Sequence, residues 1–403
     1  SFNTSKVTSM YWMFSNLKKV TSLDLSNFDT KMVTNMFGLF RYCSSLKELD
    51  VSNFNTSMVK TMTGMFLGCK SLIKLDLSNF DTSNVTDMSS IFQECTNLKE
   101  LNLSSFNTSN VTNMRSMFQN CGSLTNIDVS SFDTSKVVNM SYMFSGVIVR
   151  TLDLLNFDTS KVTIMSNMFG DAKILSINLS SFDTSSVTDM SSMFYGCKNL
   201  TKLDLSNFDT SKVDNMTQMF RGLRSLTELD VSKFDTSSLK VANFMFVGDY
   251  KLKKLDVSNW NTSKLESALG IFQDCSGLTE IDVAKWDTNN LTCSQAMFNF
   301  CSGLNVLDLS NFNTSKVTDF RWMFNGCYNL TTIYVKEYDS ETDTGWTTKS
   351  ANSSYNTTSM FENDSKLVGG NGTTYDANKR TIEYATIDTA ETPGYFTNIN
   401  DKP

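Results

Sequence analysis

The chain has 403 residues, with 35 basic against 42 acidic side chains and a net charge of -7, and this balance excludes a nucleic-acid surface, which needs clustered Lys and Arg to neutralise phosphate. The sequence contains no histidine, which excludes Ser-His and Cys-His nucleophile pairs and every His-ligated metal site. No stretch approaches the roughly 20 apolar residues of a membrane-spanning helix, so no membrane insertion of this segment is expected.

A repeat runs through most of the chain. Each of thirteen units opens with Phe or Trp, the opening aromatic, followed by Asp or Asn and then Thr, and another Phe stands twelve residues later. The period is 26 residues, and two consecutive units, 132–156 and 157–181, have 25. A fixed period of this length predicts a solenoid whose coils bury their apolar sides against one another. The opening aromatics are Phe2, Phe28, Phe54, Phe80, Phe106, Phe132, Phe157, Phe182, Phe208, Phe234, Trp260, Trp286 and Phe312.

Residues 182–205 illustrate the elements expected within one coil. Apolar residues recur every three or four positions over 188–194, which predicts one or two turns of helix. Leu203 and Leu205 alternate with polar residues, which predicts a short strand over 201–205. The Asp, Asn, Thr and Ser residues between strand and helix predict polar turns that bond their own backbone.

The outward position of the predicted strand carries charges whose sign alternates from coil to coil. Opposite charges on neighbouring strands of one sheet face stabilise each other by about 0.2–1 kcal/mol per pair, so the alternation predicts parallel strands stacked in register. The charges form two runs, Glu48, Lys74 and Glu100, and Lys202, Glu228, Lys254 and Glu280.

Eight of the nine cysteines occupy one repeat position. In other units Leu17, Val147, Ala172 and Leu223 fill it, so the position takes a small apolar group, and buried free Cys behaves as one. The alternative is disulfides between stacked coils, although parallel Cβ vectors suit that bond poorly. The eight are Cys43, Cys69, Cys95, Cys121, Cys197, Cys275, Cys301 and Cys327, and the ninth is Cys293.

A line of Asp residues recurs at the end of the predicted strand. One interpretation is a stripe for cations or basic ligands, since hard cations take clustered carboxylate oxygens. The other is that each Asp accepts hydrogen bonds from turn amides and from Ser or Thr of the next coil, and this is favoured because the Gly-rich calcium repeat is missing. The line comprises Asp24, Asp50, Asp76, Asp128, Asp153, Asp204, Asp230, Asp256, Asp282 and Asp308, with Asn102 and Asn178 in two coils.

The consensus of the units closely resembles the BspA-like leucine-rich repeat proteins of bacterial cell surfaces. Residues 203–236, LDLSNFDTSKVDNMTQMFRGLRSLTELDVSKFDT, display it well, and the resemblance covers residues 1 to about 338. It implies an α/β repeat, a leucine-rich-repeat-like solenoid of about 13 coils with a parallel sheet on one face and short helices or turns on the other. It also implies an extracellular, cell-surface location and a role as an adhesin or host-contact protein.

Residues 339–403 depart from the period and are expected to form a divergent C-terminal cap on the solenoid of residues 1–338. Met360, Phe361 and Leu367 resemble the remains of one more coil, and the cap is expected to cover the last exposed strand edge. The glycine cluster at 369–372 is not a P-loop, because the Lys-Ser/Thr of that motif is missing. The array begins inside a repeat at Ser1, which suggests a fragment of a longer protein.

Ligand-binding positions are expected where otherwise similar coils differ, mainly beside the predicted helix. Several of these positions carry aromatic residues, which are favoured anchors in protein and sugar recognition. The alternative is that the aromatic side chains fill space between coils. The candidates are Tyr11, Trp12, Tyr42, Tyr142, Tyr195, Phe244, Phe300 and Trp322.

Two classes of function remain open. A binding module would hold a host extracellular protein or glycan, whereas a passive spacer or surface-lattice component would have no such ligand and could self-associate laterally. An enzyme is not expected, because catalytic carboxyls need different environments to separate their pKa values and the Asp line is regular. No metal, cofactor or catalytic residue is expected.

Overall fold

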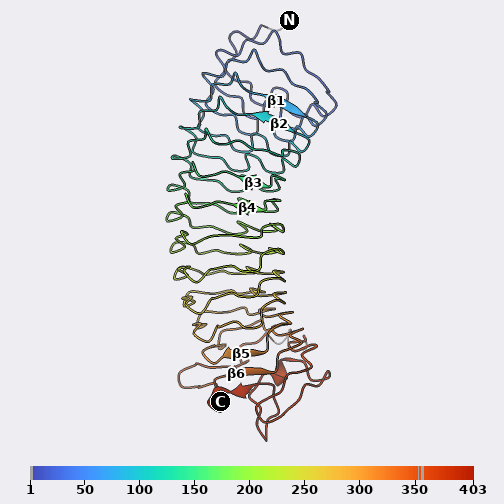
Figure 1. Ribbon diagram of the computed structural model, residues 1–403, viewed down its shortest axis with the longest axis vertical. Helices are drawn as coiled ribbons and strands as arrows, with labels where there is room; N and C mark the ends of the chain where they lie inside the picture. The colour runs from blue at the N-terminus through green and yellow to red at the C-terminus, as the bar shows by residue number, and fades with distance from the viewer. Residues whose placement is uncertain (1–2, 353, 355–357) are drawn as a thin grey trace. The chain divides into compact units, whose positions relative to one another are not determined.

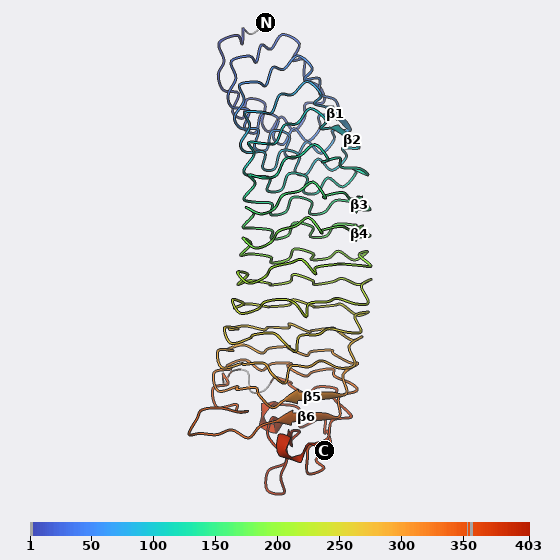
Figure 2. The same cartoon turned by 60° about the vertical axis from the view of Figure 1, so that its left-hand side comes forward.

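The computed structural model describes residues 3–352, 354 and 358–403; the first opening aromatic, Phe2, lies outside them. The chain divides into two compact units, Ser1–Asp189 with Met193–Phe208, and Met190–Ser192 with Asp209–Pro403. Within each unit the backbone winds into successive coils that lie side by side (Figures 1 and 2). The predicted solenoid is therefore present in both units.

Short parallel strands form at some of the coils and pair with the same position of the next coil. Leu75 lies opposite Leu101, and Leu152 lies opposite Ile177 across the shorter repeat. The pairs are β1 (Lys74–Asp76) with β2 (Glu100–Asn102), β3 (Thr151–Leu152) with β4 (Ser176–Ile177), and β5 (Val306–Leu309) with β6 (Thr332–Val335), which also pairs with β7 (Thr397–Asn398).

The predicted in-register stacking of charges is confirmed where strands pair. Lys74 Nζ lies 3.1 Å from Glu100 Oε2, and Glu228 stands opposite Lys254 in a parallel bridge. The strand expected over 201–205 is wrong, since that segment is irregular. Asp204 Oδ1 accepts the Ser206 amide at 3.0 Å, so the backbone turns directly after the Asp and leaves little extended chain to pair.

The segment expected to be helical is a series of turns instead. The Leu39 amide donates to Met36 O three residues earlier (3.2 Å), but the next amide, Phe40 N, donates to Met65 O of the following coil (2.9 Å). An α-helix would satisfy all of these amides internally, whereas here they alternate between the turn and the neighbouring coil. Gly38, between the two, has φ +59°, and Ser192 in residues 188–194 has φ +56°. The helix prediction is wrong, and the alternative of turns is confirmed.

The two 25-residue coils lack one small turn. In a 26-residue coil, the residue three after the cysteine position donates to its carbonyl, as Leu72 N does to Cys69 O at 3.2 Å. In the shorter coils, residues 147–149 and 172–174 run on without that turn. The missing residue therefore comes from the connection to the strand and leaves the other turns unchanged.

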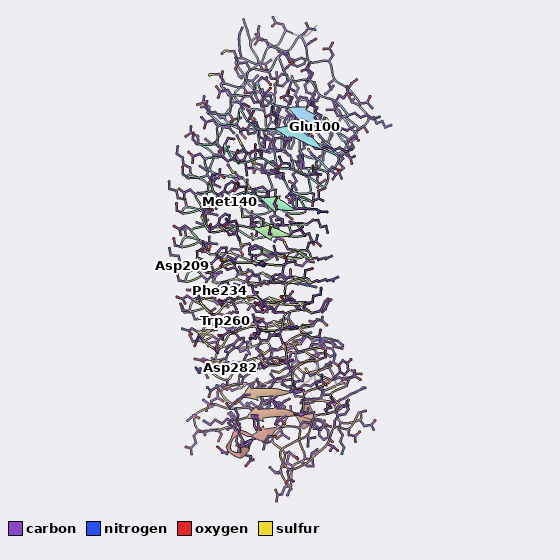
Figure 3. All side chains as sticks on the ribbon, viewed as in Figure 1. Glu100, Met140, Asp209, Phe234, Trp260 and Asp282 are labelled. Atoms are coloured by element: carbon purple, nitrogen blue, oxygen red, sulfur yellow. The ribbon has the colours of Figure 1, made fainter. Side chains whose placement is uncertain are left out.

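Stacked rings and cysteines form the core of each coil. Phe66 and Phe92 lie with ring centroids 5.9 Å apart and an interplanar angle of 4°, and the opening aromatics Phe234 and Trp260 are also buried (Figure 3). All nine cysteines are free, which contradicts the disulfide alternative. The Cys69 thiol donates to Phe40 O of the preceding coil at 3.2 Å, so the thiols also link neighbouring coils.

The Asp and Thr residues at the turns have separate tasks. Asp24 Oδ1 accepts the Ser26 amide at 3.0 Å, a bond within the same coil rather than to the next, which confirms the turn interpretation and corrects its partner. The Thr side chains are buried and join coils. Thr108 Oγ1 accepts from Asp133 N and donates to Asp133 O, each at 2.8 Å.

The C-terminal segment continues these contacts from three separate stretches of chain. Thr347 N donates to Thr314 Oγ1 at 2.7 Å, Phe361 stacks on Phe324 with centroids 5.6 Å apart, and β7 pairs with β6. Two 3-10 helices, η2 (Ile382–Tyr384) and η3 (Ile399–Asp401), also lie in this segment. The expected covering of the last strand and the remnant coil at Phe361 are confirmed, while the boundary at residue 338 stays a prediction.

Candidate functional site

Six of the eight aromatic candidates stand at backbone positions with positive φ. One such position lies ten residues after the opening aromatic and another lies fourteen after it, and most other coils place Gly or a small or polar residue there. Bulky residues rarely adopt this conformation, so their presence needs an explanation. The residues are Trp12 (55°), Tyr42 (58°), Tyr142 (60°), Phe244 (58°), Phe300 (57°) and Trp322 (56°).

Four of these rings lie across a glycine of the following coil. A Cβ on Gly68 would stand 2.4 Å from Tyr42 Cδ1, and a Cβ on Gly326 would stand 2.4 Å from Phe300 Cδ1. Trp12 covers Gly38 and Phe244 covers Gly270 in the same way. The glycines make room for the rings, and this contact agrees with the alternative that the aromatics fill space between coils.

Part of each candidate nevertheless remains exposed, and some of the rings gather. In the first unit Tyr11 stacks on Trp12 and on Phe37, with centroids 4.8 and 5.2 Å apart. Tyr42, Tyr142 and Tyr195 are half-buried in other coils of that unit. The eight candidates are divided between the two units, with Phe244, Phe300 and Trp322 in the second. Their role in ligand binding stays a prediction.

The second unit contains an aromatic pair that the sequence reasoning found only in half. Phe300 is 37% exposed and Tyr328 is 45% exposed, and their centroids are 6.5 Å apart. Tyr328 was missed because it stands at a polar-looking position sixteen residues after an opening aromatic. Tyr250 occupies the same position two repeats earlier in the pattern of three coils and is also 45% exposed, so comparing this position between coils would have found both.

Arginine side chains accompany several candidates and were also missed. Arg321 lies 5.6 Å from the ring centroid of Trp322, and Arg115 lies 5.9 Å from that of Tyr142. Each Arg directly precedes its aromatic or stands one repeat before it, so the pairing is visible once the coils are aligned. Such cation–π pairs fix the rings and place positive charge beside them.

Two buried carboxyls break the pattern of the cysteine position. Asp249 stands fifteen residues after Phe234, where other coils have Cys or an apolar residue, and is 2% exposed. It accepts the Leu223 amide at 2.7 Å, and burial raises the pKa of its carboxyl well above the usual range. Asp364 does the same in the remnant coil, accepting the Cys327 amide at 2.8 Å. The expectation of a small apolar residue is therefore wrong at Asp249.

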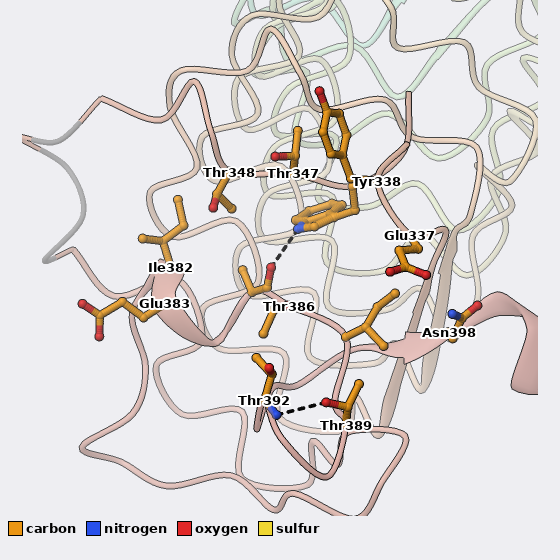
Figure 4. A pocket seen from close by; sticks show the side chains of 13 residues that line it. Glu337, Tyr338, Thr347, Thr348, Ile382, Glu383, Thr386, Thr389, Thr392 and Asn398 are labelled. Carbon is orange, nitrogen blue, oxygen red and sulfur yellow. Dashed lines mark hydrogen bonds between the residues drawn. The ribbon is translucent and has the colours of Figure 1, made fainter. Parts of the chain in front are cut away.

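The largest cleft of the second unit lies in the C-terminal segment. This cap cleft has a volume of about 600 Å³, and its walls come from residues near 337–348, 382–392 and 398 (Figure 4). Sequence reasoning missed it because these stretches lie outside the period. The described residues include no group of three Cys, Asp or Glu side chains that could hold a metal ion, and no helix among them is long and apolar enough to cross a membrane.

Comparison with known proteins gives one family match. The model of a family described as "Mycoplasma protein of unknown function, DUF285" matches residues 1–99, 69–149, 148–254, 199–305 and 243–370. No curated protein matches the chain.

Several solved structures are similar to the chain. A leucine-rich cell surface protein from Faecalibacterium prausnitzii is 18% identical, with a TM-score of 0.41 over 75% of this chain and 77% of that one. A leucine-rich repeat protein from Bacteroides ovatus is 16% identical, with a TM-score of 0.35 over 86% of each chain. The functional domain of InlJ from Listeria monocytogenes, which includes a cysteine ladder, is 18% identical, with a TM-score of 0.32 over 78% of this chain and 65% of that one.

Proposed function

The chain belongs to the family described as "Mycoplasma protein of unknown function, DUF285", and from that premise we propose that it is a BspA-like cell-surface protein that binds a host extracellular protein or glycan. The proposal treats the coils as a scaffold without enzymatic activity. Binding then depends on the few positions at which the coils differ, because the remaining side chains serve stacking.

The observation that carries the proposal is the exposed pair Phe300 and Tyr328. Their rings lie 6.5 Å apart and are 37% and 45% exposed, although one face of Phe300 already covers Gly326. Filling space explains that covered face but leaves the exposed faces without a structural task. Aromatic side chains offer large contact area at small cost in conformational entropy, which suits them as binding anchors.

The competing proposal is a passive spacer or a lattice component that self-associates laterally. The fit of aromatic rings over glycines supports it, since coil packing alone accounts for that contact. The two proposals differ in the consequence of removing an exposed ring. A spacer tolerates the change, whereas a binding module loses its ligand.

The test is a binding screen followed by two matched variants. The purified chain is screened against extracellular-matrix proteins, immunoglobulins and a glycan array, and any ligand is then measured with Tyr328→Ser and Tyr250→Ser. Both tyrosines occupy the same repeat position and are 45% exposed, but only Tyr328 contacts Phe300. We expect at least tenfold weaker binding for Tyr328→Ser and little change for Tyr250→Ser. A screen without any ligand, or equal loss in both variants, would favour the spacer.

A further inference from the structure

The cap cleft has a rigid aromatic floor. Trp346 is 6% exposed, its Nε1 donates to Ala385 O at 3.0 Å, and its ring meets Phe396 edge to face with centroids 4.8 Å apart. The hydroxyl of Tyr338 donates to Asp343 Oδ1 at 2.7 Å, which fixes the second ring of the lining. Both aromatic side chains are therefore held before any ligand arrives, and little entropy is lost when one binds.

The rest of the lining is rich in hydroxyl groups. Thr348, Thr386 and Thr392 line the cleft, and their hydroxyls bond to no protein group within the part of the chain that the structure describes. Figure 4 shows these side chains on different walls, with Thr386 near the indole ring. Free hydroxyls that converge on an aromatic floor suit a ligand that has its own hydroxyl groups and one apolar face.

The charges of the lining narrow the ligand further. Glu337 and Glu383 both line the cleft, whereas none of its lining residues is Lys or Arg. Neither carboxylate forms an ion pair with any described residue. Carboxylates accept hydrogen bonds strongly from hydroxyl and ammonium groups but repel acidic ones. An acidic ligand is therefore disfavoured.

We propose that the cap cleft binds one or two sugar units of a carbohydrate without acidic groups, with the sugar lying against Tyr338 and Trp346. A volume of about 600 Å³ is within the range of small-molecule sites. The site is independent of the Phe300 and Tyr328 pair, because neither residue lines the cleft. The failure of one proposal therefore leaves the other standing.

The test measures sugar binding to the whole chain by isothermal titration calorimetry. The probes are maltose, glucosamine and chitobiose, with glucuronic acid as the acidic probe. Thr386→Val removes one free hydroxyl at nearly constant shape, and Glu337→Gln removes one negative charge. Glu341→Gln is the matched control, since Glu341 is exposed in the same segment but does not line the cleft.

We expect at least one of the first three probes to bind, with affinity at least fivefold weaker in Thr386→Val and unchanged in Glu341→Gln. Glu337→Gln is expected to weaken glucosamine binding more than maltose binding, because only glucosamine carries an ammonium group. Thermal melting checks that the variants remain folded. The proposal is overturned if none of the three probes binds, if glucuronic acid binds best, or if a folded Thr386→Val binds as tightly as the unchanged protein.

Discussion

The buried carboxyl of Asp364 should make the attachment of the C-terminal segment depend on pH. Asp364 is 0% exposed, its Oδ1 accepts the Cys327 amide, and its Oδ2 is buried without a hydrogen-bond partner among the described residues. Burial raises the pKa of this carboxyl from 3.8 to about 8. The folded protein therefore keeps the proton over a pH range in which the unfolded chain has already lost it.

The sign and size of the effect follow from this difference. A group that binds its proton more tightly in the folded state contributes stability that is fully present below pH 3.8 and is lost as the pH rises to about 8. Raising a carboxyl pKa from 3.8 to about 8 corresponds to a loss of up to about 6 kcal/mol across that range. Asp364→Asn keeps an acceptor for the Cys327 amide but cannot ionise, so it should lack this dependence.

Hydrogen exchange of peptides that cover 320–330 and 358–368 would measure the effect. Exchange is followed at pH 5, 6.5 and 8, with times rescaled for the intrinsic chemical rate, in the unchanged protein, Asp364→Asn and the surface control Asp401→Asn. We expect protection to fall with pH in the unchanged protein and in the control, and to change less in Asp364→Asn. The reasoning is refuted if all three proteins lose protection equally.

Three further outcomes follow from the contacts between coils. Gly68→Ala should cost about 1–3 kcal/mol in urea unfolding, because φ is +73° and the new Cβ would meet a tyrosine ring, whereas Gly122→Ala, with its nearest atom at 3.9 Å, should cost less than about 1 kcal/mol; equal costs would contradict this. Thr108→Val should cost about 1–3 kcal/mol by leaving a backbone amide and carbonyl unpaired, and the exposed Thr112→Val should stay within about 0.5 kcal/mol; a neutral Thr108→Val would show that the Thr bonds add nothing. Cys293, the only cysteine that is not fully buried, should react first with Ellman's reagent, as peptide mapping would show, and rapid labelling of the other thiols would disprove the burial argument.

The period predicted the coils, their register and the core, because stacking places equal residues above one another. It did not separate helix from turns, since apolar steps of three and four residues fit both. The deciding information was the position ten residues after the opening aromatic, where Gly38 and Ser192 adopt positive φ. Backbone conformation of this kind is visible in sequence only where Gly recurs, and here Ser, Tyr and Trp share the position.

The candidate site was predicted less completely than the fold. Aromatic candidates such as Phe300 were found because they break the pattern, but Tyr328 was not, because its partner lies in another coil. Asp249 could have been found by counting fifteen residues from Phe234. The cap cleft could not, since its walls come from segments that no period relates and that only tertiary folding brings together.

The threonine contacts have a consequence for how such a chain can change its length. Thr108 joins Asp133 through both its backbone groups, and Thr314 makes the same two bonds to Thr347 of the cap. Every coil therefore presents the same connection to whatever follows it, whether that is another coil or the final segment. Recombination that adds or removes one complete repeat leaves every connection matched, whereas a partial repeat leaves one unmatched. The unit of inheritable length variation in this array is thus the whole coil.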